Sequence, residues 1–228
     1  MTRLGDSLDG KRVLVTQARD FMGPALVEGF REHGAEVFTG EEPLAEPGAA
    51  EELVRSAADV DVLIANLSFP APVTTAAEVG DDEWRAVFAH LVDPLPRLVR
   101  AVLPQMTARG SGKVVVIGSA TALRGMRNCS TYSAARGAQV AYVRAVGTEV
   151  APLGIQVNLI AQNFVENPTY FPDEVRALPA FQERLRREVP AQRLGTPRED
   201  AMLAIFLASD ECRFMVGQSV PFAGGWVT

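Results

Sequence analysis

Three side chains of complementary chemistry lie close together in the middle of the chain. Twelve residues separate Ser119 from Tyr132, and three separate Tyr132 from Arg136. Residues four apart on a helix share a face, so the phenol and the guanidinium would be neighbours. A serine hydroxyl can orient a substrate oxygen, and a phenol can act as acid or base. An arginine stays charged, and its charge lowers the pKa of a nearby tyrosine toward neutrality. The set predicts proton transfer at a substrate oxygen.

These three residues need a strand end and a helix start on either side of a short loop. Residues 113–117 form an apolar run typical of a buried strand, and the run ends just before Ser119. Residues 130–150 have the length and pattern of a long helix, which places Tyr132 and Arg136 in its first turns. Such a connection can bring the three side chains into one cleft.

The same alternation of strands and helices runs through the rest of the chain. We predict further strands at 13–15, 35–38, 61–65 and 155–160, and helices from Pro24 to about Gly34 and over 84–109. Pro94 and Pro96 mark a break or kink in the second helix, and residues 40–50 form a surface connection. Strands this apolar are buried on both faces, which requires a parallel sheet between two helix layers.

The predicted fold is therefore α/β: one Rossmann-like, doubly wound, three-layer αβα domain over residues 1–228. In such sheets, ligands bind outside the carboxyl ends of the strands, near the point where the strand order reverses. The segments that would meet there are 16–23, 65–70, 118–124 and 161–171.

Composition limits the classes of partner. The net charge of -6 and the scattered acidic residues leave no basic surface for nucleic acid or an anionic membrane. No stretch approaches the ~20 apolar residues of a membrane span, and the first residues do not resemble a signal peptide. Cys129 and Cys212 are far apart, without a CxxC pair or a histidine cluster, so we expect neither a disulfide nor a metal site. We expect a cytoplasmic protein that acts on a neutral small molecule.

The central motif resembles that of a known enzyme family. The segments Ser119-Ala-Thr and Ser130-Thr-Tyr132-Ser-Ala-Ala-Arg136 are similar to the Ser-x12-Tyr-x3-Arg motif of halohydrin dehalogenases, which are relatives of the short-chain dehydrogenases/reductases. In the dehydrogenases, the last motif position is a lysine that holds the nicotinamide ribose. This chain has only Lys11 and Lys113. The segments Gln192-Arg-Leu-Gly195, Gly217-Gln and Ala223-Gly-Gly225 resemble the wider dehydrogenase family.

Other positions depart from the dehydrogenase pattern. The TGxxxGxG turn is replaced by Thr16-Gln-Ala-Arg-Asp-Phe21-Met-Gly23, which keeps only the last glycine. The glycines of that turn allow the backbone to approach the pyrophosphate, and Phe21 would place a ring near the phosphate and nicotinamide. The dehydrogenase asparagine falls on Leu91, so the proton relay would differ. A Pro-Gly pair is replaced by Gln162-Asn163. The resemblance thus implies an enzyme without a dinucleotide cofactor.

The resemblance also implies an activity. Ser119 would position the substrate oxygen, Tyr132 would remove its proton, and Arg136 would tune Tyr132, so that a vicinal haloalcohol closes to an epoxide and releases halide. In reverse, halide, azide, cyanide or nitrite would open the epoxide. By the same resemblance, the halide pocket would be lined by Phe21, Gln162, Asn163, Phe164, Val165 and Phe171.

The resemblance further implies a homotetramer in which the helices at 84–109 and 130–150 form a four-helix bundle between subunits. Two alternatives to the dehalogenase remain. One is an NAD(P)-dependent short-chain oxidoreductase with degenerate motifs, which would have to bind a nucleotide despite Phe21. The other is a non-catalytic Rossmann-like binding protein, in which changing Tyr132 would have no effect on turnover.

Overall fold

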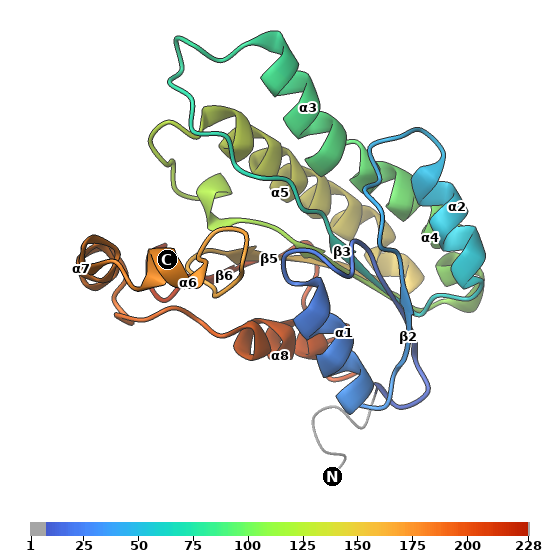
Figure 1. Ribbon diagram of the computed structural model, residues 1–228. Coiled ribbons are helices and arrows are strands. Elements are labelled where there is room, and N and C mark those ends of the chain that lie inside the picture. The colour runs from blue at the N-terminus through green and yellow to red at the C-terminus, as the bar shows by residue number, and fades with distance from the viewer. Residues whose placement is uncertain (1–7, 228) are drawn as a thin grey trace.

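The computed structural model describes residues 8–227 and contains a six-stranded, all-parallel sheet (Figure 1). The strand order is β2-β1-β3-β4-β5-β6, so it reverses at β1 and β3. The strands are β1 (Arg12–Val15), β2 (Glu36–Thr39), β3 (Val62–Asn66), β4 (Gly112–Ile117), β5 (Ile155–Gln162) and β6 (Ser219–Phe222). This confirms the predicted doubly wound, Rossmann-like fold.

Helices cover both faces of the sheet, as Figure 1 shows. One face carries α1 (Gly23–Glu32) and α8 (Pro197–Ala208). The other carries α2 (Ala49–Ala57), α3 (Asp81–Leu91), α4 (Pro94–Arg109) and α5 (Ser130–Val150). Two further helices, α6 (Asp173–Arg176) and α7 (Pro179–Glu188), lie beside the C-terminal residues. Single 3₁₀ turns, η2 (Ala120–Ala122) and η3 (Ala151–Leu153), follow β4 and α5.

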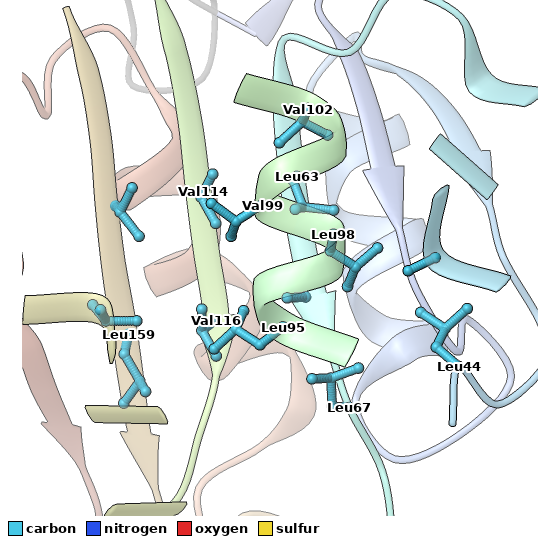
Figure 2. Close-up of a cluster of buried hydrophobic side chains, with 14 of the residues drawn as sticks. Leu44, Leu63, Leu67, Leu95, Leu98, Val99, Val102, Val114, Val116 and Leu159 are labelled. Carbon is cyan, nitrogen blue, oxygen red and sulfur yellow. The ribbon is translucent and has the colours of Figure 1, made fainter. Parts of the chain in front are cut away.

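The larger core lies between the sheet and α4. Leu95 and Val99 of this helix face Val114 and Val116 of β4, and all four side chains are at most 1% exposed (Figure 2). Burying such side chains contributes roughly 1.5–3 kcal/mol each. This packing holds β4 and its carboxyl end in a fixed position, and Ser119 follows that end.

The break predicted at Pro94 and Pro96 in the helix at 84–109 is confirmed: the segment forms two helices, α3 and α4, and the break falls just before Pro94, where proline removes a backbone donor. The structure differs from the predicted elements in two other places. Helix α2 overlaps the end of the predicted surface connection at 40–50. Elements α6 to α8 and β6 were not predicted; α8 begins with a capping box between Thr196 and Glu199.

Within residues 8–227, no helix is long and apolar enough to cross a membrane, and no group of acidic, cysteine and histidine side chains could hold a metal ion. Cys129 and Cys212 are free, buried thiols.

Candidate active site

A cavity of about 290 Å³ lies at the carboxyl edge of the sheet. Eight of the nine residues predicted for the site line it: Ser119, Tyr132, Phe21, Gln162, Asn163, Phe164, Val165 and Phe171. A larger hollow of about 370 Å³ lies at the opposite edge, beside Lys11 and Lys113, and contains none of them. The sequence therefore located the candidate site, although the role of each residue stays a prediction.

Ser119 is held in place by the 3₁₀ turn that follows β4. Its hydroxyl oxygen accepts a hydrogen bond from the backbone N–H of Thr121 at 3.2 Å and lies 3.0 Å from the Thr121 hydroxyl. Both side chains line the cavity. Ser119 is thus fixed by its own local turn and presents a hydroxyl of defined position to a ligand.

Tyr132 and Arg136 occupy the first turns of α5, but only the tyrosine lines the cavity. The Arg136 Cζ lies 5.0 Å from the centre of the Tyr132 ring, and the side chain is completely buried. The prediction that Arg136 shares the cleft is therefore corrected: it lies behind the tyrosine. The reason is that its donors are bound to the main chain at the ends of two strands.

Those contacts leave the Arg136 charge unneutralised. Its terminal nitrogens donate to the carbonyls of Ile117 at 3.1 Å and Leu67 at 3.0 Å. No carboxylate in the described part of the chain pairs with it, and its Nε has no partner there. A buried cation bound only by neutral acceptors favours negative charge nearby, and the Tyr132 phenol is adjacent.

Gln139 is a residue that the sequence analysis missed. Its Oε1 accepts from Arg136 at 3.0 Å, and its Nε2 donates to the backbone carbonyl of Leu91 at 2.5 Å. Leu91 is the position where the dehydrogenase asparagine was expected, and here its carbonyl is bound by a protein side chain. A polar residue three positions after Arg136 on a buried helix face was the signal that could have revealed this link.

Tyr170 was also missed. Its hydroxyl donates to the Phe69 carbonyl at 2.8 Å and lies 3.5 Å from the Tyr132 hydroxyl. Burial raises the Tyr170 pKa well above its ordinary value, and the neighbouring Tyr132 adds to the effect. Tyr170 therefore remains a neutral donor and is unsuited to act as the base. Only its place in the 161–171 segment pointed to the site, because no fixed spacing links it to Tyr132.

Aromatic rings form part of the cavity wall. Phe164 stacks on Phe171 with centroids 5.9 Å apart, and Phe21 meets the Tyr170 ring edge-on at 5.7 Å. The Asn163 side-chain oxygen accepts from the Phe164 N–H at 2.8 Å. Gln162 also lines the cavity, and its buried amide has no hydrogen-bond partner among residues 8–227.

The loop between β1 and α1 lies where a dinucleotide would bind in a fold of this kind. Gln17 and Phe21 occupy the first two glycine positions, yet both keep a left-handed backbone, with φ of 44° and 55°. The Gln17 side chain turns inward, where its Oε1 accepts from the Ser68 N–H at 2.6 Å. Side chains thus take space that glycines leave free, and every terminal nitrogen of Arg136 is already bound. These residues do not fit a bound NAD(P).

Two residues outside the cavity behave as the sequence suggested for a surface loop. Glu41 and Glu42, which follow β2 where a ribose-binding acid could lie, are exposed. Glu41 forms an exposed ion pair at 2.6 Å with Arg19 of the loop between β1 and α1.

Comparisons with known proteins find both reductases and dehalogenases. A family model described as Enoyl-(Acyl carrier protein) reductase matches residues 46–227. The 3-oxoacyl-[acyl-carrier-protein] reductase of Vibrio harveyi is 30% identical over 96% of this chain and 98% of its own. The Pseudomonas aeruginosa protein of the same name is 32% identical with the same coverage.

Among solved structures, one titled a dehalogenation enzyme has a TM-score of 0.91 and 28% identity, covering 97% of this chain and all of its own. A halohydrin dehalogenase bound to ethyl (2S)-oxiran-2-ylacetate has a TM-score of 0.88 and 28% identity, covering 96% and 98%. An Agrobacterium tumefaciens 3-oxoacyl (acyl-carrier-protein) reductase with NADP bound has a TM-score of 0.90 and 26% identity, covering 98% and 97%.

Proposed function

This chain belongs to the short-chain dehydrogenase/reductase superfamily, and we propose that within it the chain is a cofactor-independent halohydrin dehalogenase. One observation carries the proposal. The Ser119 and Tyr132 pair of the fold is intact and faces a cavity, while the loop that would hold a dinucleotide is filled by Gln17 and Phe21. An enzyme with this pair and no hydride carrier can still catalyse reactions that need only proton transfer and displacement.

The proposed reaction uses two side chains that line the cavity. Ser119 binds the hydroxyl oxygen of a vicinal haloalcohol, and Tyr132 as phenolate takes the proton from that oxygen. The oxygen then forms a bond to the adjacent carbon while the carbon–halogen bond breaks, and the halide leaves with its electron pair. The products are an epoxide and halide, and the proton on Tyr132 passes to solvent. In the reverse direction, Tyr132 protonates the epoxide oxygen as a small anion attacks.

Two features of the site bear on the charges that the proposed reaction would develop, on the base and on the leaving halide. The Arg136 guanidinium, which no carboxylate in the described residues neutralises, lies 5.0 Å from the centre of the Tyr132 ring. Phe21 and Phe164 line the cavity into which a halide would leave, and the positive edges of aromatic rings stabilise an anion without trapping it.

A direct test uses the purified, nucleotide-free protein and a simple vicinal bromoalcohol. We expect bromide release that does not change when NAD(H) or NADP(H) is added, and no micromolar binding of any of the four nucleotides in calorimetry. Nucleotide binding together with a failure to release bromide would overturn the proposal.

The second candidate is an NADP-dependent reductase, favoured by the 30–32% identity to 3-oxoacyl reductases. It requires Gln17 and Phe21 to leave their present positions. Oxidation of NADPH in the presence of a 3-oxoacyl thioester would identify it. A protein with neither activity would instead fit the non-catalytic binding alternative.

We further propose that the protein is a homotetramer. A shallow groove between α4 and α5 is lined by apolar parts of Leu103, Pro104, Tyr142 and Val146, together with Arg100, Thr107 and Glu149. A second copy of the same helix pair would cover it. Light scattering that returns only a monomer at micromolar concentration would contradict this proposal.

A further inference from the structure

The wall of the cavity contains one charged side chain among the described residues that line it, Arg184. It belongs to α7, and its Cζ lies 5.5 Å from the centre of the buried Phe164 ring. The side chain is 42% exposed, so its charge is available at the opening of the cavity. The other polar groups of the wall are neutral hydroxyls and amides.

The Arg184 charge is only partly neutralised. Its Nε contacts Glu188 at 3.1 Å, and the other oxygen of Glu188 contacts Arg187 at 2.8 Å. Hydrogen bonds from Arg187 and then Arg184 hold the Glu188 pKa below its usual value. Two arginines therefore share one carboxylate, which leaves a net positive charge. Neither terminal nitrogen of Arg184 has a hydrogen-bond partner within residues 8–227.

The remaining donors have a geometry suited to one class of ligand. Two terminal nitrogens of a guanidinium match the two oxygens of a carboxylate, and the Arg184 guanidinium lies over the Phe164 ring in the cavity wall. The cavity of about 290 Å³ is at the small end of ligand pockets, so the reacting carbons and the charge must belong to one short molecule.

We infer that Arg184 determines specificity by binding a carboxylate, so that the substrates are short haloalcohols or epoxides carrying an acid group. This inference rests on the proposed function and names its substrate class. It also replaces the expectation, drawn from composition, of a neutral substrate. Ser119 and Tyr132 would hold the reacting oxygen while Arg184 holds the other end of the molecule.

The test compares 4-bromo-3-hydroxybutanoate with its methyl ester, which carries the same reacting atoms without the charge. Bromide release should show a KM for the acid at least about 10-fold below that for the ester. In Arg184→Met, the KM for the acid should rise about 10- to 100-fold, as expected when charge-assisted hydrogen bonds are lost. Its kcat, and both constants for the ester, should change by no more than about 2-fold.

Arg187→Met is the matched control. It removes the same charge from the same helix and the same glutamate, but Arg187 does not line the cavity. We expect it to leave the KM for acid and ester within about 2-fold of the wild type. Folding should survive in both variants, because Glu188 keeps one arginine in each and the methionine stem can still cover Phe164.

A second readout separates the two proposals. Calorimetry with 3-hydroxybutanoate, which has no leaving group, should show binding that Arg184→Met weakens and Arg187→Met does not. If bromide is released equally from acid and ester and Arg184→Met changes neither, the carboxylate inference fails and the dehalogenase stands. If no bromide is released but 3-hydroxybutanoate binds through Arg184, the dehalogenase fails and the carboxylate site stands.

Discussion

Two segments at the same edge of the sheet differ in what their side chains leave open to a ligand. In the segment from Ser119 to Arg136, the side chains of Ser119 and Tyr132 line the cavity, and Arg136 lies behind Tyr132. The loop from Thr16 to Gly23 keeps a glycine-like backbone, but Gln17 and Phe21 fill the space around it. In this loop the backbone follows a path suited to glycine, and the side chains on it decide what can bind beside it.

The largest effect is expected from a substitution in the segment from Ser119 to Arg136. Tyr132→Phe retains the ring and removes the only cavity-lining phenol suited to accept a proton, so bromide release should fall by about 100- to 10,000-fold. Steady-state kinetics with a vicinal bromoalcohol measures this. A variant with near-wild-type turnover would exclude the mechanism.

The next effect concerns a third region, helix α8, which lies outside both segments. Its residue Asp200 is a buried carboxyl group with no cation beside it among the described residues. Its carboxylate has no hydrogen-bond partner in the part of the chain described, and burial raises its pKa to about 7. The pKa of Asp200 is lower in the unfolded chain than in the folded protein. Part of the free energy of unfolding that is present near pH 4 is therefore lost as the pH rises to about 7. Asp200→Asn should therefore increase the free energy of unfolding by roughly 2–4 kcal/mol at pH 8.

Urea unfolding of wild type and Asp200→Asn at pH 4.5, 6 and 8 measures that difference. It should be small at pH 4.5 and largest at pH 8. Because the two proteins share all other titrating groups, a difference that is equal at every pH would show that Asp200 does not bind a proton more tightly in the folded state.

The third effect is expected from a substitution in the loop from Thr16 to Gly23. Phe21→Ala removes the ring that borders the leaving halide, so transition-state stabilisation should fall by about 1–3 kcal/mol and bromide should inhibit less strongly. Folding should survive, because Phe21 lies on a turn beyond the strand. Unchanged bromide inhibition together with a large loss of stability would assign Phe21 a purely structural role.

The smallest effect distinguishes the two tyrosines. Tyr170→Phe loses the hydrogen bond to the Phe69 carbonyl, which should cost about 1 kcal/mol in the free energy of unfolding. Turnover should change only a few-fold, because Tyr170 is a donor and not the base. If kinetics shows a loss as large as that of Tyr132→Phe, the assignment of the base must be revised.

The sequence predicted the parts that depend on local patterns. Apolar runs identified the strands from β1 to β5, and the motif spacing identified Ser119 and Tyr132. The short strand β6 was not predicted, because it has four residues and contains Pro221. Gln139, Tyr170 and the position of Arg136 depend on contacts between distant segments, such as Leu67 and Leu91, which no local pattern specifies.

The loop beside Phe21 has one more consequence. The Asn66 side-chain amide donates to the carbonyls of Gln17 and Asp20, both at 3.0 Å, and so clamps two turns of a loop that already holds residues in a costly backbone conformation. A rigid wall of this kind excludes substrates that are too large, because it does not move to accommodate them. We therefore expect bulky substituents on the halogen-bearing carbon to be rejected outright, while variation at the other end of the substrate, toward α7, is tolerated by degree.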